Sequence, residues 1–426
     1  MKKNLPIIIA AVVLALILGV VAVVTSQPEP TEPTTVPTTE PTTEPTTEPT
    51  TEPTTEPTTE PTTEPTTEPT TEPTEPPVLF RNPLNGTPMD EPYAGRVFAV
   101  TINNVWQALP HRGVSQADLY FEMFINDYCT RGLAMFTDVS EIPEIGSVRS
   151  TRYNFTDLAQ GYNAIIAHAS ASQEVRNDMY NSGVDQMNVD SWIGHRDSIR
   201  YNYQDYAWEH TLFVSGQELL EAAEYYEFIL DYKKAHEEAQ KDLDPKEQTP
   251  YEARDYGMLF DEDAMILDGE EAYEIEIIFT LYGRTKTTIM KYDEELGKYI
   301  YWQYGEEMID ENSLLAEPEE GEEEPEEIPE AFTNVFVILA PSYNSGVYHI
   351  AELDGEGEGY YACGGEIVKI KWVHEEEEDP FTFFLEDGTP LVQQVGNSYI
   401  AIAPTDSPVN LTPFPEPEVP TEPAVE

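Results

Sequence analysis

The sequence predicts an α+β fold, in which a mixed α/β region is followed by a β-rich region. Residues 78–257 alternate short apolar runs, typical of strands, with helical patterns, and residues 258–404 contain strand patterns separated by turn residues. Residues 27–77 consist almost only of Thr, Glu and Pro in a TTEP repeat. We therefore expect a folded part that follows a disordered stalk and an N-terminal transmembrane helix.

The first 26 residues are expected to anchor the chain in a membrane or to direct its export. Lys2 and Lys3 precede an apolar run, residues 7–24, which is long enough for a helix to cross the bilayer core. A secretory signal usually has a shorter apolar segment, so a retained anchor is favoured, although residues 24–26 also permit cleavage. The basic start places the remainder outside the cytoplasm, as a single-pass protein of the cell membrane.

The TTEP repeat of residues 27–77 predicts an extended stalk. Proline excludes helix and sheet, and the repeat has no apolar face to bury. At about 3.1 Å per residue in the polyproline II conformation, such a segment spans roughly 150 Å. Residues 405–426 are again rich in Pro and Glu, and we expect a disordered tail.

The mixed region has five clear elements in its first half. Three strand patterns occupy residues 96–103, 119–125 and 132–137, and the short turn between the last two predicts a hairpin. A helix is expected before Gly161, capped by Ser150 or Thr151, and an apolar strand is expected at residues 163–167.

Two further helices in this region have clear start signals. Ser172 is placed to cap a helix that ends at Gly183. Ser215, followed three residues later by Glu218, has the spacing of a capping box at the start of a second helix.

The β-rich region contains eight strand patterns and one acidic loop. Residues 316–330 are dominated by Glu and Pro, and we expect this loop to be disordered. The acidic run at residues 354–359 reads as an ordinary turn, because it lacks the full pattern of a calcium loop. The strand patterns occupy residues 274–282, 287–292, 299–304, 334–340, 348–353, 366–373, 381–385 and 399–402.

The charge of the chain excludes two classes of partner. The sequence has 81 acidic and 22 basic side chains, a formal net charge of −59. Such a polyanion does not neutralise phosphates over a broad surface, so we expect no nucleic-acid binding, and contact with the membrane only through the N-terminal helix. Cys129 and Cys363 are too few for a disulfide framework; two thiols are favoured, but the sequence leaves their pairing open.

The strongest site candidate lies within residues 146–172. Arg149 and Arg152 fall at a predicted helix N-terminus, and their spacing of three would place them on one face of a helical turn. His168 falls where the next strand ends. These residues either hold an anionic group, with His168 as acid or base, or they form a structural set in which the arginines pair with nearby acids.

No motif identifies a reaction. The sequence has no nucleophile elbow, metalloprotease helix, phosphate-binding loop or zinc spacing, so we expect no cofactor and no metal, and the catalytic residues, if any exist, are unknown. Arg196 and His210 lie in a tyrosine-rich loop, residues 191–212. Such loops occur at sugar-binding surfaces and also as plain loop packing, which is the favoured interpretation.

Several sequence blocks resemble one known family. The blocks NPLNGTP, FAVTINN, SQADLYFEM and IGSVRSTR, followed by NVFVILAP, GGEIVKIKW, DPFTFFLEDGTPL and GNSYIAIAP, resemble the YerB-like lipoprotein family of bacteria, whose activity is unassigned. The resemblance implies an exported, two-part α+β protein. This chain differs from the pattern of the family in three features: the absence of a lipid-bearing cysteine, the TTEP stalk and the acidic insertion.

The resemblance also contributes site residues, because the recurring blocks of the family include five basic side chains of unassigned role. Together with the loop residue Arg196, the candidate ligand-binding residues are Arg131, Arg149, Arg152, His168, Arg196 and His210. We expect a membrane-tethered extracellular module that binds a cell-envelope component or a partner protein and is not an enzyme. The alternative is a cell-envelope enzyme that acts on an anionic wall polymer.

Overall fold

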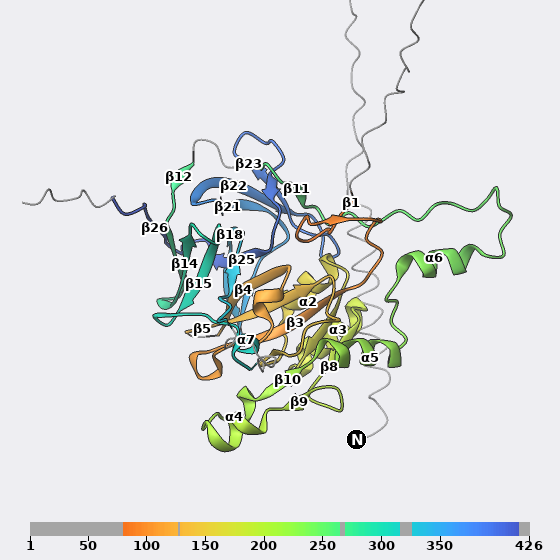
Figure 1. Cartoon of the computed structure of the whole chain (residues 1–426), viewed down its shortest axis with the longest axis horizontal. Coiled ribbons are helices and arrows are strands. Elements are labelled where there is room, and N and C mark those ends of the chain that lie inside the picture. Colours follow the sequence, from red (N-terminus) through yellow and green to blue (C-terminus); the bar gives the residue numbers. More distant parts are fainter. Residues whose placement is uncertain (1–79, 127, 265–268, 316–325, 417–426) are drawn as a thin grey trace, which may run out of the picture. The chain divides into compact units, whose positions relative to one another are not determined.

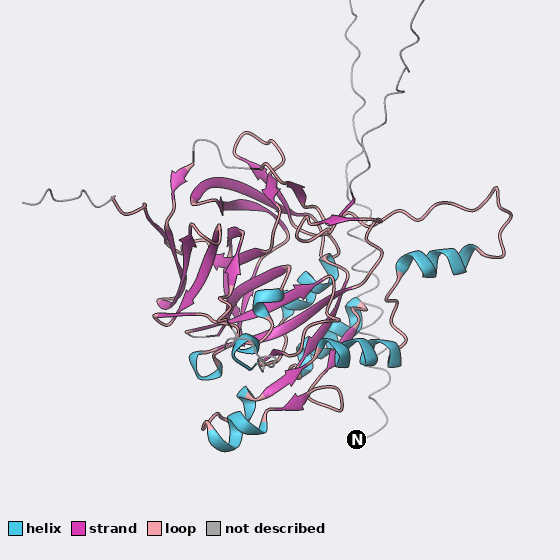
Figure 2. Ribbon diagram, in the orientation of Figure 1, coloured by secondary structure: helices cyan, strands magenta, loops and turns pink. Residues whose placement is uncertain are grey.

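The structure, a computed structural model, describes residues 80–126, 128–264, 269–315 and 326–416 (Figure 1). The expected transmembrane helix and TTEP stalk lie outside these residues. Within the described ranges, no helix is both long and apolar enough to cross a membrane. Helices and sheets occur together throughout the described part (Figure 2), which confirms the predicted α+β class.

One 11-stranded sheet runs through both regions of the folded part. Its centre is the parallel pairing of β25 with β4, which brings Ser398 opposite Leu119 and Ile402 opposite Met123. The sheet therefore crosses the expected region boundary at residue 257 without interruption. Its strands, in spatial order, are β12 (Glu270–Glu271), β22 (Glu366–His374), β21 (Gly355–Cys363), β18 (Asn334–Ala340), β25 (Ser398–Pro404), β4 (Leu119–Asn126), β5 (Cys129–Phe136), β3 (Val97–Asn104), β7 (Ala164–His168) and β8 (Gln186–Asn188), with β23 (Thr382–Leu385) paired to β22.

A second, 6-stranded sheet packs against one face of the first. Burial alternates along β13, so that Ile275, Ile277 and Phe279 join Val100 and Tyr120 in one apolar cluster. The strands of this sheet are β16 (Glu306–Glu307), β15 (Lys298–Gln303), β14 (Arg284–Asp293), β13 (Glu274–Leu281) and β26 (Val409–Thr412), with β17 (Ala331–Phe332) paired to β15.

A buried ion pair joins the two sheets. Glu122 of β4 is fully buried and accepts from the ammonium group of Lys286 on β14. The hydroxyls of Tyr301 and Tyr399 donate to the same carboxylate at 2.9 and 2.6 Å. Because a buried carboxylate needs several donors, this network fixes how the sheets meet.

Two helices cover the opposite face of the main sheet (Figure 2). Phe155 and Leu158 of α2 and Val175 and Met179 of α3 enter a second apolar cluster. By contrast, α6 has no buried residue and projects from the body (Figure 1). The helices are α2 (Tyr153–Gly161), α3 (Gln173–Ser182), α4 (Ser198–Tyr203), α5 (Gly216–Tyr225), α6 (Tyr232–Gln240) and α7 (Glu311–Leu315), with short 3-10 turns η1 (Trp106–Ala108), η2 (Val114–Gln116) and η3 (Trp208–His210).

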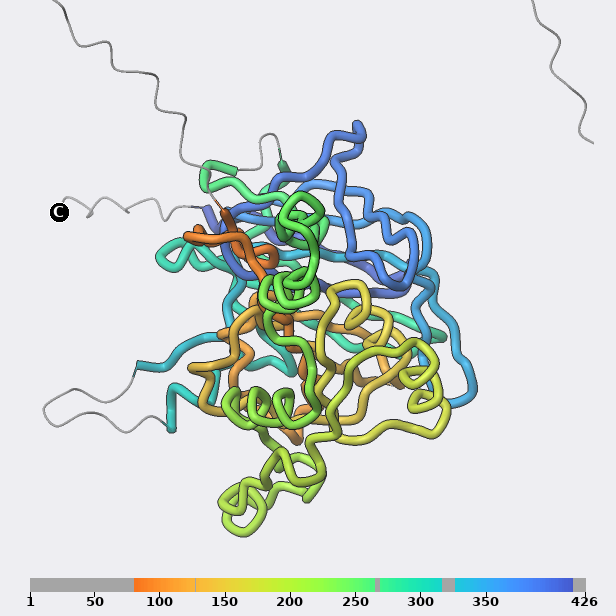
Figure 3. The backbone as a smooth tube through the Cα atoms, turned by 90° about the vertical axis from the view of Figure 1, so that its right-hand side faces the viewer, coloured from red at the N-terminus to blue at the C-terminus, as the bar shows by residue number. Residues whose placement is uncertain are grey.

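Four small sheets complete the fold. The segment that includes α4 forms a lobe that stands out from the body in two perpendicular views (Figures 1 and 3). A three-stranded sheet lies at the base of this lobe, and consists of β6 (Ile145–Gly146), β10 (Leu212–Val214) and β9 (His195–Arg196). The remaining pairs are β1 (Phe80–Arg81) with β2 (Pro88–Met89), β11 (Leu259–Asp261) with β24 (Val392–Gln394), and β19 (Ser342–Ser345) with β20 (Tyr348–Ala351).

Two of the predicted helix starts are confirmed and one is wrong. The Ser172 hydroxyl accepts from the backbone of Val175, and Ser215 forms the predicted capping box with Glu218. The helix predicted to begin with a cap at Ser150 or Thr151 instead begins after Arg152, without a side-chain cap. Residues 149–151 are therefore not helical.

Three segments are more ordered than the sequence predicts. Residues 354–359, expected to form a turn, lead into the long strand β21, in which Gly357 lies against the Trp372 indole and Gly359 lies against the backbone of Val337. The expected C-terminal tail contributes β26 to the second sheet. At the end of the acidic loop, Glu330 is fully buried beside His111.

Candidate functional site

The candidate site lies at one edge of the main sheet, where β3 and β7 end and β5 begins. The parallel strand β7 ends at His168, one residue beyond the pairing of Ala167 with Val100, while β3 continues to Asn104, and Asn103 of β3 lies opposite Arg131 of β5. The segment before α2 crosses this edge, because Arg149 donates its backbone N–H to Thr101 at 3.0 Å and accepts from Ala169 at 2.9 Å. The carboxyl ends of parallel strands are a frequent ligand-binding position in α/β sheets.

Three arginines converge at this edge. The guanidinium groups of Arg131 and Arg152 both donate to the carbonyl oxygen of Ser150, and Arg152 also donates to Thr151 at 2.8 Å. Arg149 is the neighbour of Ser150 in sequence. We call Arg131, Arg149 and Arg152 the arginine cluster.

The arginine cluster has hydrogen-bond donors that the described part of the chain leaves unused. The Nε atom of each of the three side chains is buried and has no acceptor there. Burial, together with the charges of Arg152 and Arg149, holds the pKa of Arg131 well below its usual range. Burial also lowers the pKa of Arg149 and Arg152. Such a cluster is stabilised when an anion supplies the missing acceptors.

Among the described residues, no carboxylate forms an ion pair with the arginine cluster, although the chain has 81 acidic residues. None of the ion pairs between described residues involves the arginine cluster. Other arginines of the same region do pair with acids, as Arg96 does with Asp185 at 2.9 Å and Arg196 does with Asp190. Glu209 is the acid whose charge raises the pKa of Arg149, but it makes no ion pair with it. Among the residues that the structure describes, no acid therefore pairs with this cluster.

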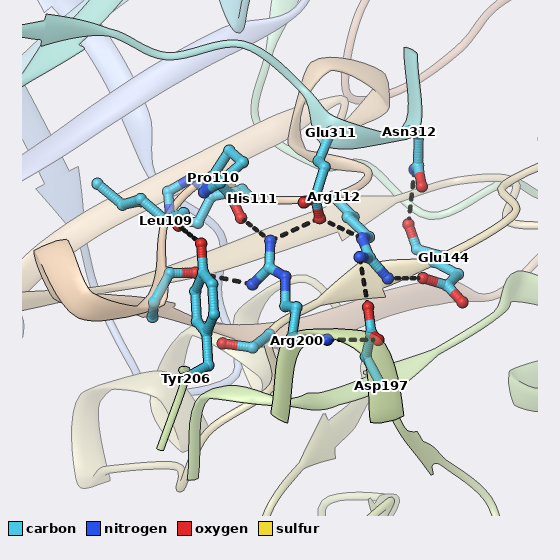
Figure 4. Close-up of polar contacts among 12 residues, drawn as sticks. Leu109, Pro110, His111, Arg112, Glu144, Asp197, Arg200, Tyr206, Glu311 and Asn312 are labelled. Carbon is cyan, nitrogen blue, oxygen red and sulfur yellow. Dashed lines mark hydrogen bonds and ion pairs between the residues drawn. The ribbon is translucent and has the colours of Figure 1, made fainter. Parts of the chain in front are cut away.

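Arg112 and Arg200 show what a structural arginine looks like in this fold (Figure 4). Glu311 of α7 accepts from Arg112 at 2.5 Å and from Arg200 at 2.6 Å. Arg112 also pairs with Asp197 at 2.6 Å and with Glu144. Every charge in this buried network has a partner, which is the usual condition for burying ionised groups.

His168 contacts the backbone next to the segment that carries Arg149 and Arg152. Its Nδ1 lies 3.0 Å from the carbonyl oxygen of Ser170, and its Nε2 lies 2.9 Å from the side-chain oxygen of Gln186. The same Ser170 oxygen accepts from the backbone of Thr151 at 3.2 Å. Burial lowers the pKa of His168. With both ring nitrogens engaged, His168 positions the turn that holds the arginine segment.

Arg196 and His210 lie at the margin of the arginine cluster. The Nδ1 atom of His210 is 2.9 Å from the amide nitrogen of Asn103, and the charge of Arg149 helps to lower the pKa of His210 after burial. Arg196 is near enough to lower the pKa of Arg149, but its guanidinium already binds Asp190 and stacks on Trp208 at 4.7 Å.

Sequence reasoning did not identify two further residues at the site. An ionised Cys129 would raise the pKa of each of the three guanidinium groups, which indicates that its side chain lies near the arginine cluster. The Tyr348 ring of β20 lies 5.6 Å from the Arg152 guanidinium. Cys129 is two residues from Arg131 on β5, so strand periodicity places both on one face of the sheet. No sequence signal links Tyr348 to residues almost 200 positions earlier.

The arrangement can bind an anion. Each guanidinium presents a planar set of N–H donors that matches a carboxylate or phosphate. Among the residues that the structure describes, no group of three or more His, Cys, Asp or Glu side chains is placed to hold a metal ion. The chemistry that these side chains offer is hydrogen bonding to an anion.

Comparison with known proteins places the chain in a family. Residues 84–228 match the model of the N-terminal domain of the family described as "Protein of unknown function (DUF3048)". Residues 278–400 match the model of the C-terminal domain of the same family. The chain belongs to this YerB-like family. The resemblance predicted from the sequence blocks is thus confirmed.

One sequence relative and one solved structure are similar to this chain. The chain is 24% identical over 318 residues to a Bacillus subtilis (strain 168) protein named "Putative lipoprotein YerB", which covers 72% of this chain and 81% of the relative. The crystal structure of YerB from Bacillus subtilis matches with a TM-score of 0.60 and 21% identity, over 78% of this chain and 99% of that one. At this level of identity the structural likeness shows the fold.

Proposed function

We propose that this YerB-like protein is an exported, membrane-anchored binding module whose arginine cluster holds an anionic group of a cell-envelope component. The observation that carries the proposal is the convergence of Arg131, Arg149 and Arg152 with no carboxylate partner among the described residues. Three cations kept together without acids destabilise the free protein, and a bound anion offsets this cost.

The location outside the cytoplasm is supported by the start of the chain. Lys2 and Lys3 followed by the apolar residues 7–24 match a single-pass anchor with the folded part outside. The relative from Bacillus subtilis is named as a lipoprotein, which also implies a membrane-anchored protein. On this proposal, residues 27–77 act as an extended stalk that carries the module away from the bilayer.

The alternative function, an envelope enzyme that acts on an anionic wall polymer, has less support. Its expected acid or base was His168, whose two ring nitrogens are engaged by Ser170 and Gln186. General acid–base catalysis requires a group within hydrogen-bond reach of the substrate proton. The arginine cluster supports binding, whereas the contacts of His168 do not leave its ring free to exchange a proton with a substrate.

The proposal is tested by calorimetric titration of the full chain in detergent with inorganic phosphate, at constant ionic strength. We expect binding by the wild type and at least a tenfold loss of affinity in Arg149→Gln. Arg176→Gln is the matched control, because Arg176 is exposed on α3 and lies outside the arginine cluster. Equal phosphate affinity in all three proteins would overturn the proposal.

A further inference from the structure

A solvent-exposed cavity of about 1010 Å³ is bordered by His210, which lies at the margin of the arginine cluster. Its lining comes from three segments: the loop after β3, the loop after α4, and the stretch from the end of β15 to α7. We call it the aromatic cavity, because Trp106, Tyr206 and Tyr304 line it. Its volume is at the upper end of the range for small-molecule sites.

One wall of the aromatic cavity is held in place by the paired arginine network (Figure 4). Arg200 donates to the carbonyl oxygens of Ala108 at 3.1 Å and Pro110 at 2.6 Å, and the Tyr206 hydroxyl donates to Leu109 at 2.6 Å. These bonds tie the loop after β3 to the loop after α4. A wall that is already ordered costs little entropy when a ligand binds.

The cavity presents flat aromatic faces to solvent. Trp106 is 65% exposed and Tyr304 is 45% exposed, although both line a concave surface. The Tyr304 hydroxyl donates to the backbone oxygen of Asn104 at 3.0 Å, which fixes its ring. Aromatic rings with one polar end suit ligands that have an apolar face and a polar edge.

Hydrogen-bonding side chains surround these rings. Gln107 and Gln204 offer amide donors and acceptors, and Asp205, Glu306 and Glu307 offer carboxylate acceptors. Carboxylates accept from hydroxyl groups and repel anions, so the portion of a ligand inside the cavity should carry no negative charge, and hydroxyl groups suit these acceptors. A sugar ring has both properties: a C–H face for the aromatic rings and hydroxyl edges for the carboxylates and amides.

The aromatic cavity and the arginine cluster are neighbours. His210 lines the cavity, and its Nδ1 lies 2.9 Å from the amide of Asn103. Asn103 in turn lies opposite Arg131 in the register of β3 and β5. His210 therefore connects the lining of the aromatic cavity to the strand residue opposite Arg131.

We infer that the ligand is an acidic glycan, with an uncharged sugar ring in the aromatic cavity and its anionic substituent on the arginine cluster. This inference rests on the proposed function, to which it adds the chemical class of the ligand. Trp106 and Tyr304 stack on the sugar, while Asp205, Glu306 and Glu307 accept from its hydroxyl groups.

The test is an array of immobilised acidic and neutral oligosaccharides, probed with the full chain in detergent. Four variants accompany the wild type: Trp106→Ala, Trp106→Phe, Arg149→Gln and Trp192→Ala. Trp106→Phe keeps an aromatic face. Trp192 is 57% exposed and does not line the cavity, so its variant controls for loss of any surface tryptophan.

We expect the wild type to retain acidic glycans, and Trp106→Ala to lose at least tenfold of that signal while its phosphate affinity in solution is unchanged. Trp106→Phe should restore most of the signal, and Trp192→Ala should match the wild type. If phosphate still binds but acidic glycans are not retained, or are retained equally by Trp106→Ala, the inference is overturned. The proposed function would then still stand. Trp106-dependent retention of neutral and acidic glycans alike would overturn the anionic part, and with it the proposed function.

Discussion

Arg131 and Arg152 donate to one and the same acceptor, the carbonyl oxygen of Ser150. Two guanidinium groups on one neutral oxygen repel each other, and the described residues supply no carboxylate between them. The contact comes from β5 and from the extended segment before α2, so two separate parts of the chain hold the like charges together. In a protein with 81 acidic and 22 basic side chains, this grouping of cations without an ion-paired acid among the described residues is the basis of the proposed anion site.

Replacement of Arg131 by Met should leave stability unchanged or increase it by about 1–2 kcal/mol, because a buried charge without a partner is removed while the length of the side chain is kept. Arg131 is 4% exposed. Urea unfolding of the wild type and of Arg131→Met measures the difference. A loss of more than about 2 kcal/mol would mean that Arg131 has a structural role.

Replacement of Arg200 by Gln should have the opposite effect, with a loss of about 3–5 kcal/mol, because Glu311 and two backbone carbonyls lose a donor in a buried network. Arg200 is fully buried and donates to Ala108, Pro110 and Glu311. The same urea titration reports the loss. If Arg200→Gln and Arg131→Met had the same free energy of unfolding, paired and unpaired arginines would not differ in their contribution to stability.

Glu122→Gln should cost about 3–5 kcal/mol, since it leaves the buried ammonium of Lys286 without its counter-charge between the two sheets. A second substitution, Lys286→Met, should recover part of that loss in the double variant. The coupling is measured by a double-mutant cycle in urea. Strictly additive losses would show that the pair does not interact in solution.

The stability of the fold should fall as pH rises from about 4 to 8. Burial, with the charges of Glu377, Asp178 and Asp354, raises the pKa of Asp157 to about 8, whereas an unfolded Asp titrates near 3.9. Between these values the native state holds the additional proton, so its contribution is complete below pH 4 and is lost as pH passes 8.

Asp157→Asn imitates the neutral acid and should remove this dependence. Its melting temperature should exceed that of the wild type by an amount that grows from pH 5 to pH 8 and then stays constant. Glu221→Gln, an exposed change on α5, is the control. A difference between Asp157→Asn and the wild type that does not vary with pH would contradict the raised pKa of Asp157.

The local elements of the fold could be predicted because their patterns are local. The strand predicted at residues 334–340 is β18, and the predicted hairpin is β4 with β5. The strand β21 was missed, because its start alternates Gly and Glu and its glycines are needed for close packing on Trp372 and Val337. The parallel pairing of β25 with β4 joins residues far apart in sequence, and no local pattern encodes it.

The sequence predicts part of the candidate site, but the structure shows a different reason for the proximity of its residues. Arg149 and Arg152 were selected for a helical spacing of three, but both precede α2 in extended backbone, and Arg152 itself is the N-cap residue. Arg152 shares the Ser150 carbonyl with Arg131 of β5, and Arg149 is next to Ser150 in the sequence. His168 was selected as a chemical group, and the structure places it as a support for the backbone around Ser170.

The most direct measurement is the melting temperature of the wild type and of the Arg149→Gln/Arg152→Gln double variant. Each protein is measured in sodium sulfate and in sodium chloride at equal ionic strength. An anion that binds only the native state stabilises it by about 2.7 kcal/mol at a hundred times its dissociation constant. If the arginine cluster is an anion site, sulfate raises the melting temperature of the wild type more than that of the double variant, which shows only the general stabilising effect of sulfate, and the double variant without sulfate melts no lower than the wild type. A double variant that melts well below the wild type, and responds equally to sulfate, would contradict the account.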